Sequence, residues 1–335
     1  MAMRWGILGC GDVCEVKSGP GFQKAQGSEL VAVMRRSADL AQDFAKRHRV
    51  PRWYSNAEDL INDEEVDIVY IATPPGSHLE LARTVAAASK PAYVEKPMAR
   101  NADECREMMR LFDKKNLPLF VAYYRRSLPR FQKVAELLPR LGRLKRASYT
   151  FTRCPLTDLD PLPWRLEAEL SGGGLFMDMG CHALDLLDHL VGPLQNVEGA
   201  AANGGGLYEV EDTVSMSWTW DGGIEGAANF EFSASANRDE FVFEGENGSL
   251  SAACFDVSPI VLRLNEEEES VDAPNPSHVH QPMIQAIVNE LAGTGSSPST
   301  GESALRTNIV LDQVLEKYYG GRSDEFWKRT WPNGG

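Results

Sequence analysis

The sequence predicts an α/β protein: a doubly wound parallel sheet comes first, and an α+β domain with an open, mainly antiparallel sheet follows. Apolar and helix-like segments alternate over roughly the first third of the chain. After about Tyr123, strand-like segments with alternating polar residues follow one another across short glycine turns. The chain has 335 residues. Because single hydrophobic cores stop growing at roughly 250–300 residues, we expect two domains. We place them at 1–122 and 123–335.

Short apolar runs predict the strands of the first domain. A nearly unbroken apolar run is typical of a strand that is buried on both faces of a parallel sheet. The runs lie at 5–9, 29–34, 66–72, 92–95 and 117–122. Helix-like stretches such as 38–46 separate them, and this repetition indicates strand–helix–strand crossovers.

A helix-like stretch at 129–138 and a series of polar-alternating segments predict the second domain. The segments lie at 144–152, 213–220, 224–232, 240–244 and 260–264. Glycine turns join them, which is typical of an antiparallel sheet with one solvated face. Because such a face is often covered by another subunit, we expect a homodimer through this C-terminal sheet. The acidic run 266–269 is expected to be a solvated tip between strands, and the C-terminal helices are expected to pack back on the first domain.

Composition and charge argue against several classes of protein. The 34 basic and 48 acidic residues give a formal net charge of −14, which repels a phosphate backbone, so we expect no nucleic-acid partner. The first residues lack the basic segment and apolar core of a signal peptide, and no apolar run approaches the ~20 residues that span a bilayer. The six scattered cysteines include no C-x-x-C pair, so we expect neither a disulfide scaffold nor a zinc ribbon. We therefore expect a cytoplasmic protein with no membrane partner.

A glycine-containing loop lies where the first strand passes into the first helix. The segment Gly9-Cys10-Gly11-Asp12-Val13-Cys14 has two glycines, which let the backbone turn tightly and approach a pyrophosphate at the helix N-terminus. The third position of the dinucleotide pattern is a cysteine instead of a glycine or alanine, but its side chain is small enough to pack near the sheet. Together with the strand–helix alternation, the loop predicts a dinucleotide-binding Rossmann domain in which Gly9, Gly11, Asp12 and Val13 contact the cofactor.

The end of the second strand indicates which dinucleotide is bound. An NAD site usually has a carboxylate there, whereas this chain has Arg35, Arg36 and Ser37. Two guanidinium groups and a hydroxyl suit a 2′-phosphate. We therefore expect NADP(H) to be favoured, with NAD(H) as the alternative.

The third strand ends in Thr73 and Pro74, at the edge of the sheet where a dinucleotide lies. We expect both residues to contact the cofactor. Ser77 is expected to cap the following helix, and we place His78 at the cofactor, with structural packing as the alternative.

Four motifs together resemble the Gfo/Idh/MocA family, which comprises glucose–fructose oxidoreductase, inositol dehydrogenase and their relatives. They are Gly9-x-Gly11, Ala72-Thr73-Pro74, Glu95-Lys96-Pro97 and the segment GGGLFMDMGCH at 172–182. The resemblance covers essentially the whole chain. It implies an NAD(P)-dependent oxidoreductase whose catalytic lysine is Lys96, with Asp178 and His182 as its partners. It also implies that Glu95 and Tyr123 line the cofactor pocket and that the pair Trp164-Arg165 lies against a sugar-like substrate.

The chemistry of these side chains suits hydride transfer. The reaction needs a group that gives or takes the hydroxyl proton, and a histidine such as His182 does this near neutral pH. Asp178 lies four residues earlier and would share one helical face with it. Lys96 can donate to the substrate oxygen. Whether Lys96 or His182 carries the proton stays open, as does the direction of the reaction.

The sequence indicates only the class of the substrate. Trp164 suits an apolar or sugar-ring face, and Arg126 and Arg165 suit a polar or anionic group. We also place His280 at the substrate side, with packing between domains as the alternative. The expected substrate is a sugar, a polyol or a related hydroxy or keto compound.

Three alternatives compete with this interpretation. Asp178, His182, Asp185 and His189 share a helical face and could bind a metal, but one helix rarely supplies more than two ligands, so we expect no metal. A dinucleotide-binding regulatory protein without activity would have no need for Lys96, Asp178 and His182 together. A redox-assisted lyase or glycosidase that recycles its cofactor would differ in its products.

Overall fold

The computed structural model describes residues 2–265 and 267–331, and the chain divides into two compact units, each described here by itself. The first unit contains the chain up to Ala99, Asp103–Leu128 and Asn275–Leu305. The second unit contains Arg100–Ala102, Pro129–Pro274 and the chain from Arg306 onward. The division therefore groups residues 123–128 and 275–305, which follow the expected boundary at 122, with the first unit.

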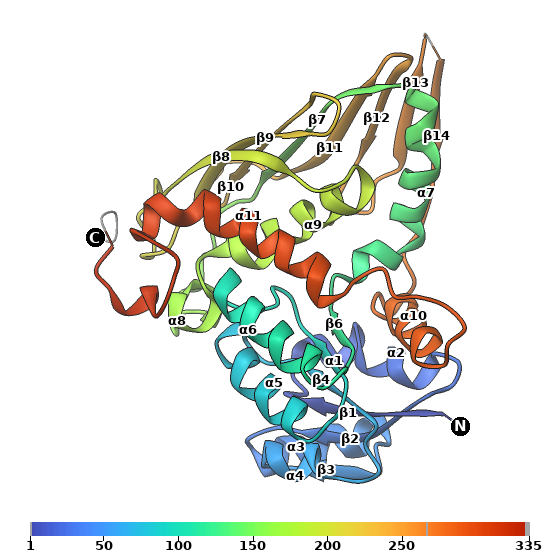
Figure 1. Ribbon diagram of the computed structural model, residues 1–335. Coiled ribbons are helices and arrows are strands. Elements are labelled where there is room, and N and C mark those ends of the chain that lie inside the picture. The colour runs from blue at the N-terminus through green and yellow to red at the C-terminus, as the bar shows by residue number, and fades with distance from the viewer. Residues whose placement is uncertain (1, 266, 332–335) are drawn as a thin grey trace. The chain divides into compact units, whose positions relative to one another are not determined.

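A six-stranded parallel sheet in the order β3-β2-β1-β4-β5-β6 forms the centre of the first unit (Figure 1). Its strands are β1 Met3–Leu8, β2 Ser28–Met34, β3 Arg52–Tyr54, β4 Ile68–Ile71, β5 Ala92–Val94 and β6 Leu119–Val121. Its helices are α1 Asp12–Val16, α2 Gly19–Lys24, α3 Ala38–His48, α4 Ala57–Ile61, α5 His78–Ala87, α6 Ala102–Asp113 and α10 Gln281–Leu291. Because β1 lies between β2 and β4, the strand order reverses there, which opens the crevice where such sheets bind ligands. The predicted doubly wound sheet is confirmed.

Consecutive residues of β1 show that helices cover both faces of this sheet. The Trp5 ring packs against Phe22 of α2, with 4.6 Å between ring centroids. The next residue, Gly6, faces the other way, where an added Cβ would lie 2.7 Å from a methyl carbon of Leu60 in α4. Since strand residues alternate between faces, α2 and α4 lie on opposite sides of the sheet. This double burial explains why β4, β5 and β6 are apolar along their whole length.

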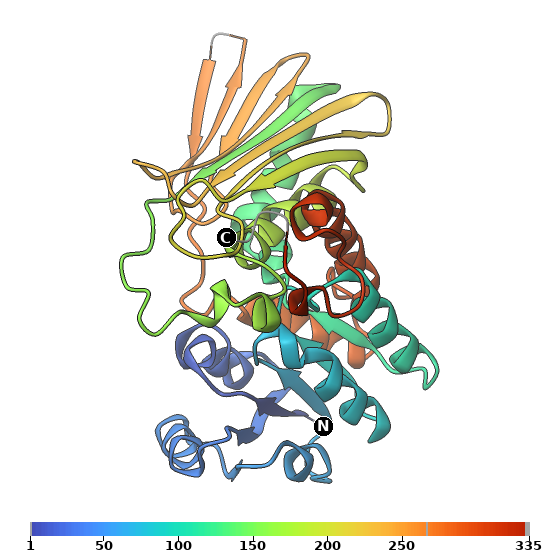
Figure 2. The same ribbon diagram turned by 90° about the vertical axis from the view of Figure 1, so that its left-hand side faces the viewer.

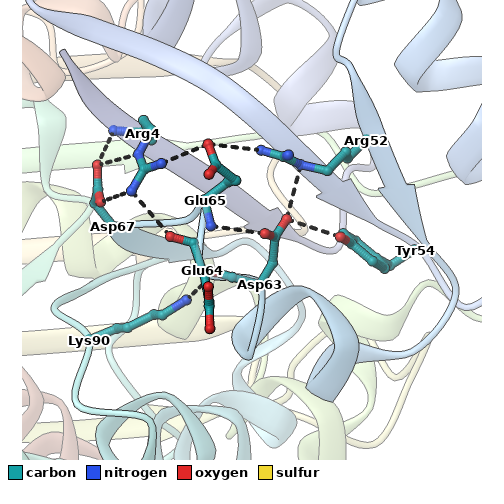
Figure 3. Close-up of polar contacts among 8 residues, drawn as sticks. All are labelled: Arg4, Arg52, Tyr54, Asp63, Glu64, Glu65, Asp67 and Lys90. Atoms are coloured by element: carbon teal, nitrogen blue, oxygen red, sulfur yellow. Dashed lines mark hydrogen bonds and ion pairs between the residues drawn. The ribbon is translucent and has the colours of Figure 1, made fainter.

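A polar cluster fixes the amino ends of these strands (Figure 3). Arg4 at the start of β1 donates to Asp67, which precedes β4, at 2.7 and 3.0 Å. Arg52 at the start of β3 pairs with Asp63 at 3.0 Å, and Lys90 before β5 donates to the Asp63 carbonyl at 2.6 Å. The Arg4 guanidinium holds the pKa of the Asp67 carboxyl below its usual value. The cluster ties together the edge of the sheet opposite the glycine loop.

An eight-stranded sheet in the order β14-β13-β12-β11-β7-β10-β9-β8 dominates the second unit (Figures 1 and 2). Neighbouring strands are antiparallel except for β10 and β7, which are parallel. The strands are β7 Leu144–Thr152, β8 Gln195–Ala202, β9 Thr213–Trp220, β10 Ile224–Glu231, β11 Arg238–Gly245, β12 Gly248–Ala252, β13 Ile260–Leu264 and β14 Glu267–Val271. The predicted open, mainly antiparallel sheet is confirmed.

Helices lie on one face of this sheet, and its other face carries small and polar side chains. The helices of the second unit are α7 Pro129–Leu137, α8 Ala168–Ser171, α9 Cys181–Leu190 and most of α11 Gly301–Tyr319. Figures 1 and 2 show α9 and α11 running beneath the strands. Aromatic side chains such as Phe230 and Phe241 are buried, whereas Ser215 and Ser217 of β9 are exposed. The burial pattern therefore alternates with period two along these strands.

The acidic run is the clearest difference from the expected elements. Glu267–Val271 is the edge strand β14, paired with β13, and is not a tip between strands. Glu268 accepts from Nε of Arg263 on β13 at 2.9 Å, so a cross-strand ion pair offsets the poor strand propensity of glutamate. Glu266 lies outside the described residues. Within the described part of the chain, no helix is both long and apolar enough to cross a membrane.

Candidate active site

The glycine loop after β1 is shaped so that only a residue without a side chain fits at Gly9. Its φ is +83°, and an added Cβ would lie 2.7 Å from Cγ2 of Thr73 and 3.2 Å from the carbonyl carbon of Ala72. The Gly9 amide donates to the carbonyl of Met34, at the end of β2, at 2.9 Å. A Cβ on Gly11 would meet only one atom, at 3.9 Å. The loop therefore lies against the ends of β2 and β4 and leaves room at Gly11 for the backbone to approach a ligand.

Cys14 takes the third position of the glycine pattern as a small buried side chain. Its Sγ lies 4.0 Å from the Gly9 carbonyl oxygen, and burial raises the pKa of its thiol well above the usual value. The next glycine, Gly19, has so little room that its Cβ would lie 2.2 Å from the Cys14 carbonyl oxygen. A neutral thiol thus fits between α1 and the sheet. Asp12 and Val13 are the first two residues of α1 and directly follow the glycine loop. Asp12 is exposed and Val13 is half-buried.

The residues that follow β2 border the same loop. Arg35 is half-buried and its amide donates to the Tyr54 carbonyl at 3.2 Å, while Arg36 is exposed. Ser37 caps α3, with its Oγ accepting from the Leu40 amide at 3.5 Å. The Met34 carbonyl, at the end of β2, accepts from the Gly9 and Cys10 amides. The chain therefore leaves β2 directly beside the glycine loop, and Arg35, Arg36 and Ser37 follow from that point.

His78 and Ser77 fix the loop after β4. The Ser77 hydroxyl lies within hydrogen-bond distance of Oγ1 of Thr73, at 2.7 Å, and of the Pro74 carbonyl oxygen, at 3.0 Å, so it closes this loop instead of capping α5. The His78 ring is completely buried, with Nε2 at 2.7 Å from the Thr73 carbonyl and Nδ1 at 3.1 Å from the Met98 carbonyl. Burial lowers the pKa of His78 to about 4. A neutral imidazole carries one N–H, so the ring donates to one of these two carbonyls and packs against the other, between the Thr73 loop and the segment that follows Lys96.

Glu95 carries a buried carboxyl group and immediately precedes the expected catalytic lysine, Lys96, in the chain. Tyr70 donates its hydroxyl to Oε1, and the Lys96 amide donates to Oε2 at 3.1 Å. Burial raises the pKa of Glu95, and the neighbouring Lys96 opposes this shift. The carboxyl group thus holds the backbone of Lys96 at the carboxyl end of β5.

His280 belongs to the chain segment that returns to the first unit. Its ring stacks on Tyr124 with centroids 4.2 Å apart, and its Nδ1 lies 3.3 Å from the hydroxyl of Tyr93. Its Nε2 lies 3.7 Å from Oε1 of Glu95. The ring has no exposed surface, and burial lowers the pKa of its imidazole well below the usual value. His280 therefore packs as a neutral ring behind Glu95.

Tyr123 and Arg126 are also buried within the first unit, with exposed fractions of 0% and 5%. Arg126 donates to the Pro298 carbonyl at 3.1 Å, and its amide donates to the Tyr123 carbonyl at 3.2 Å. The returning segment thus holds both residues after β6.

In the second unit, Asp178 and His182 lie on consecutive turns of different geometry. Asp178 is in a π-helical turn at Phe176–Gly180, and His182 is in the first turn of α9. The sequence predicted one regular helix. Within this wide turn, Gly180 packs directly onto the Phe176 ring. A residue with a Cβ would not fit there, because the Cβ would lie 2.3 Å from the ring. Such π-turns occur frequently at functional sites.

Arg165 and Trp164 lie beside Asp178 in this unit. Nε of Arg165 donates to the Asp178 carboxylate at 3.0 Å, and its guanidinium lies 4.4 Å from the centroid of the Trp164 ring. Trp164 is partly exposed and Arg165 is exposed. A flat ring, a cation and a carboxylate therefore lie together in this unit.

Phe255 is a neighbour of His182 that the sequence did not reveal. Its ring meets the His182 ring edge-on at 5.8 Å and packs on Phe151 at 5.2 Å. The turn that carries it is held by the Asp239 carboxylate, which accepts from the amides of Phe255 and Asp256 at 2.6 and 2.8 Å. No motif marks this turn, because it follows β12 as an irregular loop. Only the fold brings it to His182.

The described residues contain no group of three or more histidine, cysteine or acidic side chains placed to hold a metal ion. The cysteines within the described ranges are all free thiols. The structure thus adds nothing to the metal alternative raised by the spacing of Asp178, His182, Asp185 and His189.

Two family models match the chain. Residues 3–123 match the model described as an oxidoreductase family with an NAD-binding Rossmann fold, and residues 131–251 match the GFO/IDH/MocA C-terminal domain. The chain is 38% identical over 315 residues to oxidoreductase P35 of Formosa agariphila, covering 92% of this chain and 97% of that protein. It is 30% identical to the trans-1,2-dihydrobenzene-1,2-diol dehydrogenase of Mus musculus over 82% of this chain and 81% of that protein.

Further similarities extend over nearly the whole chain. The 1,5-anhydro-D-fructose reductase of Ensifer adhaerens is 26% identical, covering 90% of this chain and 92% of that protein. Among solved structures, the aldose-aldose oxidoreductase of Caulobacter crescentus in complex with glycerol has a TM-score of 0.84 at 22% identity. That comparison covers 93% of this chain and 96% of the other. At this identity, the structural likeness concerns the fold.

Proposed function

The chain belongs to the Gfo/Idh/MocA family of oxidoreductases, and from that premise we propose that it transfers a hydride between NADP(H) and a sugar, a polyol or a related hydroxy or keto compound. The observation that carries the proposal is the Glu95–Lys96 loop. A buried carboxyl group that accepts from the Lys96 amide at 3.1 Å holds the lysine at the edge of the sheet that faces ligands in this fold.

The glycine loop fits a dinucleotide. A Cβ on Gly9 would fill the space against Thr73, and Gly11 leaves the backbone accessible, as the approach of a pyrophosphate requires. Asp12, Val13, Thr73, Pro74 and Tyr123 complete the proposed cofactor contacts. Arg35, Arg36 and Ser37 follow β2 beside this loop. Their guanidinium groups and hydroxyl favour the charged 2′-phosphate of NADP(H) over the 2′-hydroxyl of NAD(H).

When bound, the nicotinamide supplies or accepts the hydride. Lys96 donates a hydrogen bond to the substrate oxygen and stabilises the negative charge that develops on it. Lys96 and His182 are the two groups that can exchange the hydroxyl proton, and Asp178 orients His182 from the preceding turn. The ion pair between Asp178 and Arg165 holds this carboxylate in place.

The second unit favours a substrate with a ring. Trp164 and Phe255 present flat, partly exposed faces near Asp178 and His182, and such faces suit the C–H side of a cyclic compound. Arg165 can donate to its hydroxyl groups. The relatives named for a cyclic diol and for an anhydro sugar support the same class of substrate.

A panel of cyclic and open-chain sugars, polyols and dicarbonyls tests the proposal. We expect nicotinamide absorbance to change with at least one cyclic compound, with a higher kcat/KM for NADPH or NADP⁺ than for the NAD forms. Turnover of none of them, with dinucleotide binding retained, would support a regulatory protein without activity. Product formed without added cofactor and without net change in absorbance would support a redox-assisted lyase or glycosidase.

We also propose a homodimer that forms through the outer face of the eight-stranded sheet. This face carries small side chains such as Ser215, Ser217 and Ala227, which let another flat surface approach closely. Light scattering on a size-exclusion column should give the mass of two chains, and Ser217→Arg should shift it towards one. An unchanged dimer in that variant would place the interface elsewhere.

A further inference from the structure

The turn before Asp178 rests on a buried carboxyl group that the proposed reaction does not use. Glu211 has no exposed surface. Its Oε1 accepts from the Gly174 amide at 2.8 Å, and its Oε2 accepts from the Tyr319 hydroxyl at 2.5 Å. Burial raises the pKa of this carboxyl group. A buried carboxyl group is costly unless hydrogen bonds compensate it, and both oxygens are compensated here.

Two glycines of this turn, Gly173 and Gly174, allow the backbone to lie directly on Glu211. An added Cβ on Gly174 would lie 2.4 Å from the Glu211 carbonyl oxygen. Gly173 has a φ of +159°, and its Cβ would lie 2.7 Å from Cγ of Met177. The close approach therefore requires glycine, and it explains a motif that hydride chemistry does not.

Arg322 holds the other end of the same turn. Its Nη1 donates to the Gly172 carbonyl at 2.7 Å, and its Nε donates to Asp312 at 3.0 Å. The side chain is 2% exposed and its guanidinium lies 4.0 Å from the centroid of the Phe326 ring. Tyr319 is the last residue of α11, and Arg322 lies just beyond this helix. Arg322 thus holds the Gly172 end of the glycine turn directly, and Tyr319 holds the Gly174 end through Glu211.

We propose that Glu211 is a positioning residue for Asp178 and His182 and that Tyr319 and Arg322 hold it and the glycine turn in place. The Met177 amide donates to the Gly174 carbonyl at 3.1 Å, so the clamped turn leads directly into the π-turn that carries Asp178. This inference rests on the proposed function, because it assigns the network to the placement of those two side chains.

Two neighbouring tyrosines provide a matched pair of variants. Tyr319→Phe removes the hydroxyl that donates to Glu211, whereas Tyr318→Phe removes a hydroxyl that donates to the Glu209 carbonyl at 2.7 Å. Small misplacements of reacting groups can reduce rates by up to about 100-fold. We expect Tyr319→Phe to reduce kcat by about 10-fold or more, with KM and the cofactor Kd nearly unchanged, and Tyr318→Phe to retain kcat. Equal kcat values in both variants and the wild type would overturn the inference.

Variants of Glu211 itself separate positioning from simple loss of stability. A glutamine can accept from the Gly174 amide and donate to the Tyr319 oxygen, so Glu211→Gln should keep kcat within about threefold of the wild type. Glu211→Ala should lower kcat per folded molecule. If it lowers only Tm, or if Glu211→Gln is as inactive as Glu211→Ala, positioning by this hydrogen-bond geometry is refuted.

An NMR measurement keeps the inference testable even if the proposed activity is absent. The His182 ring lies 5.8 Å from the Phe255 ring, so its Cε1–H resonance depends on its position against that ring. The resonance can be assigned by its loss in His182→Asn. A shift in Tyr319→Phe but not in Tyr318→Phe supports positioning, and identical spectra overturn it. Absence of turnover in the wild type refutes the proposed function instead.

Discussion

Replacing Gly9 by alanine tests the geometry of the glycine loop. A residue with a Cβ at a φ of +83° is strained by about 1–2 kcal/mol. The new methyl group would also lie 2.7 Å from Cγ2 of Thr73, and relieving such overpacking costs a further ~1–3 kcal/mol. We therefore expect Gly9→Ala to lower the free energy of unfolding by about 2–5 kcal/mol. We also expect the Kd of NADPH to rise at least about tenfold, because the loop must move away from the end of β4.

A control and a rescue variant isolate the two contributions. Gly27 has a similar φ of +70°, but its Cβ would make only an ordinary contact with Val288, at 3.6 Å. Gly27→Ala should therefore cost only the strain of about 1–2 kcal/mol and leave NADPH binding intact. Thr73→Ser removes the clashing methyl group and keeps the hydroxyl that accepts from Ser77. Adding it to Gly9→Ala should recover part of both losses.

Urea unfolding and calorimetric titration with NADPH measure these quantities in the wild type, in Gly9→Ala, in Gly27→Ala and in Gly9→Ala combined with Thr73→Ser. If Gly9→Ala and Gly27→Ala lose the same stability and bind NADPH equally, the proposed contact between the loop and the ligand is wrong. If Thr73→Ser gives no recovery, the loss does not come from the clash with the Thr73 methyl group.

Three further predictions follow from individual side chains. Replacing both Arg35 and Arg36 by alanine should lower kcat/KM for NADPH by about 10- to 100-fold and change that for NADH much less; equal losses in steady-state assays would refute the assignment. The pKa of His78 is about 4 in the folded chain against 6.5 ordinarily, so the unfolded chain binds more protons between these values. Stability should thus fall as the pH falls through this window, by up to about 3 kcal/mol. In urea unfolding at several pH values, His78→Gln should reduce this slope, and a slope equal to the wild type would show that other groups cause it. Phe255→Leu keeps an apolar side chain but loses the flat ring, so it should raise KM for cyclic substrates about 2- to 10-fold and spare open-chain ones; a uniform effect would argue against stacking.

The sequence predicts most of the fold because its strongest patterns are local. The strands β7, β9 and β13 begin and end where polar–apolar alternation places them. The strands that were not predicted are short or have weak strand propensity. β3 has three residues, β12 has small residues on both sides of Leu250, and β8 and β14 lie at the edges of the sheet. Pairing with a neighbour specifies such strands more than their own residues do.

The candidate site divides in the same way. Gly9, Lys96 and Asp178 are recognisable because each lies in a local motif. Phe255 and Glu211 gave no such signal, since their roles depend on contacts across many residues of chain. The sequence left two places open for His280, the substrate side and packing between domains, and the structure shows a fully buried ring with Nε2 3.7 Å from Oε1 of Glu95.

The central claim is that Lys96 acts on the substrate oxygen, and a single-turnover measurement with Lys96→Ala tests it most directly. The assay would use the best substrate of the panel, with the enzyme saturated with cofactor. We expect hydride transfer to slow by at least about 100-fold, as when one donor to a developing oxyanion is removed, while the NADPH Kd stays within about tenfold. Hydride transfer at a rate near that of the wild type would contradict the account.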